Sequence, residues 1–174
     1  MTEISEHRGS RHSLGAEHPH CDKMQLVIIL LFFAIWGIDS ASSFVSSYST
    51  VVGFVPLFVR LVLAIASLGL GLILVRKSHD IVFGEKHDQL RLVDAEVYAW
   101  IRHPMYLGTL LVCLGFFFAV PSLLSLVIWI AFFIFFDEMA TYEENDLAKT
   151  LGEDYAAYRK RVPKWFPRLM HGKS

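Results

Sequence analysis

Residues 105–136, MYLGTLLVCLGFFFAVPSLLSLVIWIAFFIFF, form a run of 32 residues without a charged side chain. Pro121 and Ser122 stand at its centre. Because proline lacks the N–H that a helix interior needs, it divides such a run. We therefore predict a hairpin of two apolar helices. Each arm of about 16 residues would be ~24 Å long, which is short for a hydrocarbon core of about 30 Å.

Two further apolar runs precede the hairpin. Residues 24–38 can extend past Asp39 to about Val45, and residues 51–75 are interrupted only by Pro56 and Arg60. Hydrophobic residues make up 54% of the chain and the mean hydropathy is +0.45, which exceeds the apolar content of ordinary soluble domains. We predict an all-α integral membrane protein with about four transmembrane helices, of which residues 24–75 form the first two.

The distribution of basic residues predicts the orientation in the membrane. Of the 16 Lys and Arg residues, only Arg60 lies within an apolar run, and the connections near residues 40–50 and near Pro121 have none. By the positive-inside rule, both termini and the connection over residues 76–104 are cytoplasmic in a multi-pass protein. The segments on either side of the hairpin then lie on the same face of the membrane, where they can meet.

Residues 1–23 contain four histidines and no apolar periodicity. We expect a disordered cytoplasmic tail. The histidine spacings match no regular ligand pattern, so we expect no metal site. The first apolar run begins too late for a cleavable signal and has no small-residue cleavage site. We also expect no structural disulfide, because Cys21 lies in this tail and Cys113 lies within the bilayer.

Arg60 and Asp39 lie at similar depths on the first two predicted helices. Charged residues inside a membrane usually face the bundle and find partners. We predict a structural ion pair between the two helices; a substrate or ion pathway is the alternative.

The segment 98–108, YAWIRHPMYLG, lies where the hairpin begins. Proline fits the first position of a helix, so Pro104 should start the helix, with His103 just before it. The free N–H groups of the first turn attract an anion such as a carboxylate, and Gly108 removes a side chain that would block its approach. Arg102 adds a fork suited to a carboxylate or phosphate. The alternative is an interfacial belt of aromatic and basic residues.

A second polar cluster follows the hairpin. An apolar stripe at helical spacing consists of Met139, Glu143, Leu147 and Leu151. Glu143 lies in this stripe and needs a partner, whereas Glu144 turns about 100° away from it. We expect Glu138 and Asp146 to belong to a solvated face, and Gly152 to end the helix.

A short helix is predicted over residues 154–161. Its apolar side, with Tyr155, Tyr158 and Val162, would fold back against the membrane surface. Four basic residues would contact anionic headgroups: Lys160, Arg161, Lys164 and Arg168.

Three linked pieces of the chain resemble the isoprenylcysteine carboxyl methyltransferase and phospholipid methyltransferase superfamily of integral membrane enzymes. They are Tyr98 with Arg102–His103–Pro104–Met105–Tyr106–Leu107–Gly108; Glu143–Glu144 with Leu147; and Gly152, Tyr155, Tyr158 and Val162–Pro163. The resemblance covers about residues 92–167. It differs at Glu96, where the superfamily usually has Gly, and at Met139 and Ala140, where an Arg is usual.

The resemblance implies that residues 76–174 form a methyltransferase core with a cytoplasmic binding region for S-adenosylmethionine. It implies these cofactor-binding residues: Tyr98, His103, Pro104, Tyr106, Leu107, Gly108, Glu143 and Glu144. Glu143 and Glu144 would balance the ammonium or sulfonium, and His103 with the helix start would hold the carboxylate and adenosine side. Arg102 and Glu143 would be catalytic, with Arg102 steering an acceptor carboxylate.

The implied partners are a lipophilic methyl acceptor that enters from the bilayer, and membrane lipids. We favour carboxyl methylation of an isoprenylcysteine-like acceptor over N-methylation of a phospholipid. A lipid reductase, a scaffold or a transporter are the alternatives outside methyl transfer. No glycine-rich dinucleotide loop follows a strand pattern, and we expect no nucleic-acid partner.

Overall fold

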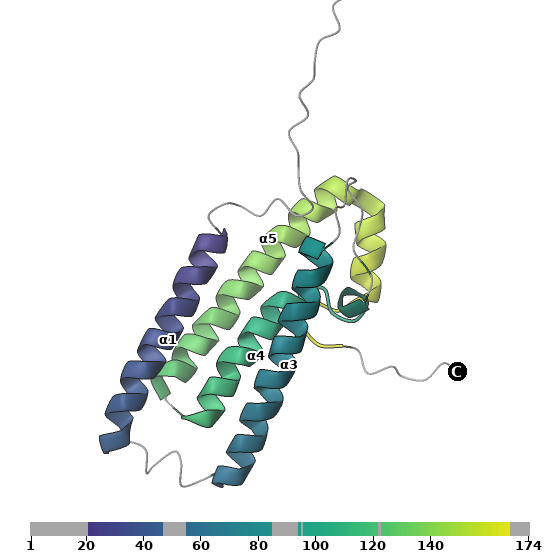
Figure 1. The fold of residues 1–174 in the computed structure, drawn as a ribbon. Helices are drawn as coiled ribbons and strands as arrows, with labels where there is room; N and C mark the ends of the chain where they lie inside the picture. The colour runs from purple at the N-terminus through teal and green to yellow at the C-terminus, as the bar shows by residue number, and fades with distance from the viewer. Residues whose placement is uncertain (1–20, 47–54, 85–93, 95, 122, 168–174) are drawn as a thin grey trace, which may run out of the picture.

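The computed structural model describes residues 21–46, 55–84, 94, 96–121 and 123–167. These residues form four α-helices and one short 3-10 helix (Figure 1). In chain order they are α1 (Cys21–Ser46), α3 (Leu57–Gly84), η1 (Glu96–Ala99), α4 (Pro104–Ala119) and α5 (Leu123–Arg161). The predicted all-α class is confirmed.

Three of the helices are long and apolar enough to cross a membrane, over Met24–Ser42, Leu57–Ile81 and Leu124–Arg161. The shorter apolar helix α4 has 16 residues, as the position of Pro121 predicts. The hairpin of α4 and α5 is therefore confirmed. We take the charge-free start of α5, up to Phe136, as its membrane-spanning part, since the first charged residue beyond the hairpin is Asp137.

Two helix ends differ from the prediction. Helix α1 begins at Cys21, so residues 21–23 are helical and not part of a tail; residues 1–20 of the predicted tail lie outside the described residues. Helix α3 begins after Pro56 and continues past residue 75 to Gly84, because residues 76–83 contain neither proline nor glycine. The connection between α3 and the hairpin is correspondingly shorter than predicted.

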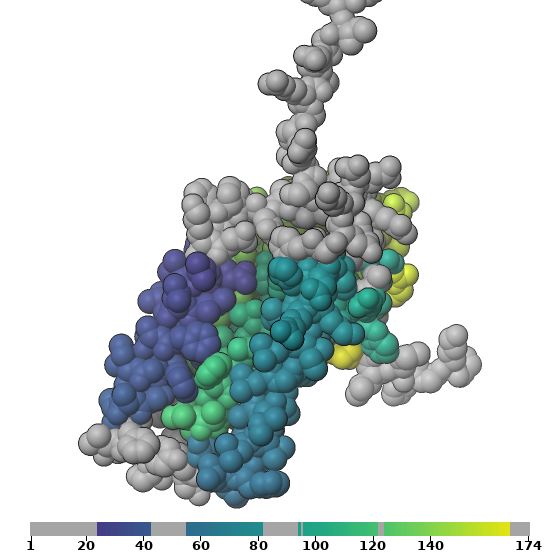
Figure 2. All heavy atoms as spheres, viewed as in Figure 1, coloured from purple at the N-terminus to yellow at the C-terminus, as the bar shows by residue number. Residues whose placement is uncertain are grey.

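The helices form a side-by-side array in which α5 lies between α1 and α4, and α4 lies between α5 and α3 (Figure 1). The space-filling view shows α1 and α3 on the near face, with α4 between them (Figure 2). The array brings the start of α4 beside the part of α5 that extends beyond the hairpin.

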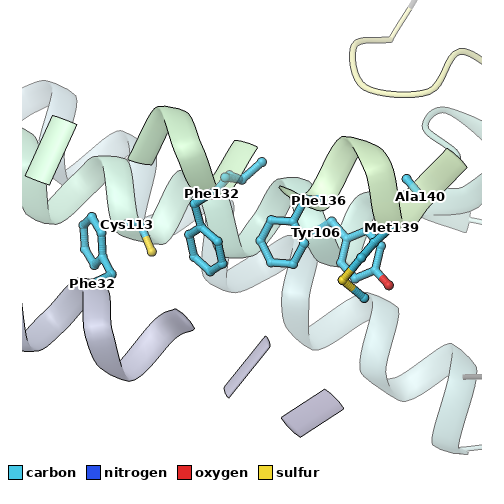
Figure 3. Packing of buried hydrophobic residues seen from close by; sticks show 8 residues of the cluster. Phe32, Tyr106, Cys113, Phe132, Phe136, Met139 and Ala140 are labelled. Carbon is cyan, nitrogen blue, oxygen red and sulfur yellow. The ribbon is translucent and has the colours of Figure 1, made fainter. Parts of the chain in front are cut away.

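A buried cluster joins α1, α4 and α5 (Figure 3). The rings of Phe132 and Phe136 lie 4.6 Å apart, and Phe136 stacks on Tyr106 at 4.8 Å with an interplanar angle of 17°. Offset stacking of this kind adds to the gain from burial. This row of rings extends from the core of the bundle to the start of α4.

Arg60 binds α3 to the C-terminal end of α4. Its Nε donates to the carbonyl of Phe118 at 3.3 Å, and its Nη2 donates to the carbonyl of Ala119 at 2.8 Å. The last carbonyls of a helix have no partner within the helix and carry a partial negative charge, so a guanidinium satisfies both needs. The Asp39 ion pair stays a prediction.

Glycines allow α3 and α4 to touch along their backbones. A Cβ atom on Gly71 would lie 2.7 Å from the carbonyl oxygen of Gly108, and one on Gly108 would lie 2.8 Å from that of Gly71. Small residues at helix contacts let membrane helices pack at close range. The missing side chain of Gly108 therefore faces α3, and the part of Gly108 in cofactor binding stays a prediction.

We expect Gly71→Ala to lower stability by about 1–3 kcal/mol, because the added methyl overpacks a backbone contact. Gly69→Ala is the matched control on the same helix, since a Cβ there meets nothing within 4 Å. Thermal unfolding in detergent checks this, and equal midpoints for the two variants would contradict the packing role of Gly71.

Candidate active site

The start of α4 is built as predicted. Pro104 is the first helical residue, and His103 precedes it with a non-helical backbone (φ −123°, ψ 61°). The C-terminal segment holds this turn from the other side, because the N–H of Arg102 donates to the carbonyl of Pro163 at 3.0 Å. The Tyr158 hydroxyl donates to the carbonyl of Tyr98 in η1 at 2.8 Å. The C-terminal segment thus holds η1 and the turn before α4 in place.

Glu144 is the centre of the site. Its Oε1 lies 3.0 Å from Nε2 of His103, and its Oε2 lies 2.9 Å from Nη1 of Arg102 and 3.6 Å from Nε of Arg159. An ionised carboxylate only accepts hydrogen bonds, so Nε2 of His103 carries the proton in this contact. The predicted meeting of the two polar clusters is therefore observed.

Glu143 lies on the other side of the imidazole. Its Oε1 accepts a hydrogen bond from the Tyr106 hydroxyl, and its Oε2 is 3.7 Å from Nδ1 of His103. The Glu143 side chain is 26% exposed, against 3% for Glu144. His103 is thus placed between two carboxylates, one buried and one open to a ligand.

The predicted burial of the two acids was the wrong way round. Glu144, and not Glu143, continues the most buried line of α5, four residues after the fully buried Ala140. Met139 and Ala140 are both buried, so the apolar pattern alone fits either line. The partners on the Arg102–His103 turn select the line that contains Glu144.

Charge keeps Glu144 ionised. Burial by itself would raise the pKa of this carboxyl, but the hydrogen bond from His103 and the charge of Arg102 outweigh it and lower the pKa below the ordinary value. Burial, with the nearby Glu144 charge, raises the pKa of Tyr155 to about 12, so that hydroxyl stays protonated.

Aromatic rings flank the two acids. The rings of His103 and Tyr106 are parallel within 4° and 5.7 Å apart. On another side, the Trp165 indole lies 6.1 Å from the imidazole. Rings beside carboxylates suit a cationic ligand group, which both attract. Within the described residues, no group of His, Cys, Asp and Glu is arranged to hold a metal ion.

Gly152 turns the chain back toward this site. Its backbone (φ 55°, ψ −123°) breaks α5 into two helical parts, which confirms the predicted helix end. The second part packs on the first and not on the membrane surface as we predicted. Its buried residues are Tyr155, Tyr158 and Val162, and their neighbours are Leu147, Ala148 and Leu151.

The sequence prediction missed residues that surround the site. Arg159 lies beside Glu144 and Trp165 lies beside His103, and the only sequence signal was their place within the resembling segment. Lys164, expected at headgroups, instead binds Asp137 at 2.6 Å, and Arg161 pairs with Asp94 at 2.7 Å. Arg168 lies outside the described residues.

The remaining predicted residues lie beside the network. Pro104 and Gly108 are buried, Leu107 and Tyr98 are half-buried, and all four belong to η1 or the start of α4. Leu107 donates its N–H to the carbonyl of His103 at 3.1 Å. Nε of Arg102 is buried with no hydrogen-bond acceptor among the described residues, so it can serve an anionic ligand.

The sequence model of the family described as phospholipid methyltransferase matches residues 50–154, which include both glutamates and the turn before α4. The chain belongs to this family. The family consists of membrane methyltransferases that use S-adenosylmethionine. The site described above contains two carboxylates, aromatic faces and a buried guanidinium, and these groups fit the charges of that cofactor.

Curated relatives carry the name protein-S-isoprenylcysteine O-methyltransferase. The chain is 36% identical over 97 residues to the protein from Schizosaccharomyces pombe, covering 53% of this chain and 39% of the relative. It is 39% identical over 88 residues to that from Xenopus laevis and 35% over 91 residues to that from Homo sapiens, each covering 50% of this chain and 31% of the relative. The similarity thus spans between about a third and two fifths of these relatives' length.

Glu96 marks a departure from the superfamily that is visible in the backbone. Its φ is +50°, the one positive value at a non-glycine residue in the described part of the chain. L-residues adopt this region at a cost, whereas glycine does not. The glycine that is usual here would therefore suit the observed loop.

We expect Glu96→Gly to raise the stability of the protein by about 1 kcal/mol, because it relieves the left-handed backbone and Glu96 is exposed. Glu96→Ala keeps the strain and serves as the control. Thermal unfolding of both variants checks this; an equal rise in both would point to the side chain instead of the backbone.

We expect Glu144→Gln to lower stability by about 3–5 kcal/mol, because it leaves the Arg102 charge buried without its anion. The adjacent change Glu143→Gln should stay within about 1 kcal/mol of the wild type, since Glu143 is partly exposed. Unfolding in detergent distinguishes them, and similar losses for both would refute the central role of Glu144.

Proposed function

We propose that the chain transfers a methyl group from S-adenosylmethionine to the carboxyl group of an isoprenylcysteine-like lipophilic acceptor. The observation that supports this most is the network in which Arg102 and His103 bind Glu144 while Glu143 remains partly exposed. The printed names of the curated relatives support the acceptor class.

Glu143 and the stacked rings of His103 and Tyr106 would bind the cationic part of the cofactor. Glu143 supplies a carboxylate that is open to a ligand, and aromatic faces attract a cation. The first N–H groups of α4 would bind the cofactor's carboxylate. Glu144 is already paired with Arg102 and His103. Its main role would therefore be to hold these two side chains in place beside the cofactor.

S-adenosylmethionine supplies an electrophilic methyl group on a sulfonium. The protein's contribution is to align donor and acceptor and to exclude water, and alignment alone can supply ~7–11 kcal/mol. Arg102 would orient the acceptor carboxylate through its buried Nε, which has no hydrogen-bond acceptor among the described residues. We place this site and both termini on the cytoplasmic side, following the distribution of basic residues.

N-methylation of a phospholipid is the second candidate, and the description of the matched family favours it. The charges at the site argue for the carboxyl acceptor. The guanidinium of Arg102 attracts a carboxylate acceptor, but it repels a protonated amine and would not bind it.

We expect saturable binding of S-adenosylhomocysteine to the purified protein in detergent, measured by calorimetric titration. Glu143→Gln should lose this binding, because it removes the charge that meets the ligand. Glu138→Gln is the matched control, since Glu138 is exposed on the same helix. Absence of binding in a folded wild-type sample, or wild-type affinity in Glu143→Gln, would overturn the assignment; binding of a reduced nicotinamide cofactor instead would favour a reductase.

The acceptor is then identified by transfer of a labelled methyl group. A farnesylated cysteine analogue should be methylated and should yield a base-labile ester, whereas phosphatidylethanolamine should not be methylated. Arg102→Lys, which keeps a positive charge beside Glu144 but lacks the Nε donor, should retain S-adenosylhomocysteine binding and lose turnover. Methylation of phosphatidylethanolamine alone would transfer the assignment to the second candidate.

A further inference from the structure

The segment after α5 is fastened to the point where α5 leaves the charge-free hairpin. Nζ of Lys164 lies 2.6 Å from Oδ1 of Asp137, 2.9 Å from the Asp137 carbonyl and 2.8 Å from Oγ1 of Thr141. Nε1 of Trp165 donates to the same Oδ1 at 2.7 Å. One carboxylate thus binds two consecutive side chains; we call Asp137, Lys164 and Trp165 the clasp.

The clasp holds an aromatic ring against the imidazole. The Trp165 ring lies 5.4 Å from that of Phe133 on α5 and 6.1 Å from that of His103. His103 in turn stacks on Tyr106, which stacks on Phe136. Trp165 therefore adds a further ring beside the imidazole, tilted by 43° to it, to the stacked row of His103, Tyr106 and Phe136.

The other end of the same segment is tied to the turn before α4, through the carbonyl of Pro163 and the N–H of Arg102. The segment is thus attached both to α5, at Asp137, and to the turn that contains His103. A surface lysine usually gains little from an ion pair, but Lys164 is only 19% exposed and contacts three acceptors. These three contacts hold the Lys164 side chain in one position, in addition to pairing its charge with that of Asp137.

We propose that Trp165 is a wall of the cofactor site and that Asp137 is a positioning residue, which sets the place of Trp165 and through it that of His103. The inference rests on the proposed function, since it assigns the clasp to the same site. An indole beside carboxylates is a suitable surface for a sulfonium or an adenine ring. Asp137 itself does not contact the reacting groups.

The test is fluorescence titration of the full-length protein in detergent with S-adenosylhomocysteine. The wild type should show a saturable change in tryptophan emission. Trp165→Phe should lose most of this change and bind about tenfold more weakly, whereas Trp100→Phe should retain both, because Trp100 is 58% exposed and lies outside the clasp.

Asp137→Asn should weaken binding of S-adenosylhomocysteine by about tenfold, because it removes the charge that holds Lys164, while Asp137→Glu should recover part of the loss. Glu138→Gln on the neighbouring position should bind as the wild type does. Thermal unfolding of each variant separates weakened binding from loss of the fold.

Two results would overturn the inference and leave the proposed function standing. Both require that Glu143→Gln has lost binding. The first is that Asp137→Asn binds S-adenosylhomocysteine with wild-type affinity, and the second is that Trp165→Phe shows an unchanged emission response. A wild-type protein that is folded and binds no S-adenosylhomocysteine would instead overturn the proposed function, and the inference with it.

Discussion

The contacts of Glu144 with Arg102 and His103 are the constraint on which the part of the protein beyond the apolar hairpin depends. A buried ion pair adds little net stability, because desolvating both charges offsets their attraction, but removing one partner is costly. Its effect is therefore to specify an arrangement. It fixes α5 against the turn before α4 at one register, and the second part of α5 then packs around both.

That second part reaches the site because α5 is not one straight helix. Gly152 adopts a backbone conformation that only glycine takes readily, and the chain after it reverses onto the first part (Figure 1). Tyr158 and Pro163 then contact η1 and Arg102. Helix α5 thus supplies both acids of the site from its first part, and its second part packs beside them.

The sequence predicted the fold class, the hairpin and the start of α4 because these depend on local signals: uncharged runs, Pro121 at the midpoint and Pro104 at a first helical position. It also brought the two polar clusters together from charge asymmetry alone. Helix ends were less accurate, as at Gly84, because nothing local ends α3 earlier.

Tertiary partners decided what the sequence could not. Whether Glu143 or Glu144 is buried depends on the position of Arg102, which helical periodicity does not contain. Lys164 resembles a headgroup anchor until Asp137 is seen beside it. The close approach of Gly108 to Gly71 depends on how α3 packs on α4, which the sequence around Gly108 does not contain.

Helix α4 is tethered at both ends, by the Arg60 guanidinium at Phe118 and Ala119 and by the Glu144 network at His103. Helix α4 has 16 residues between these two points. Its length therefore sets the distance between the site and the far end of the bundle. One inserted residue would shift the tethers by ~1.5 Å and rotate them by ~100°. Substitution of side chains along α4 leaves this spacing unchanged, whereas an insertion or a deletion alters it.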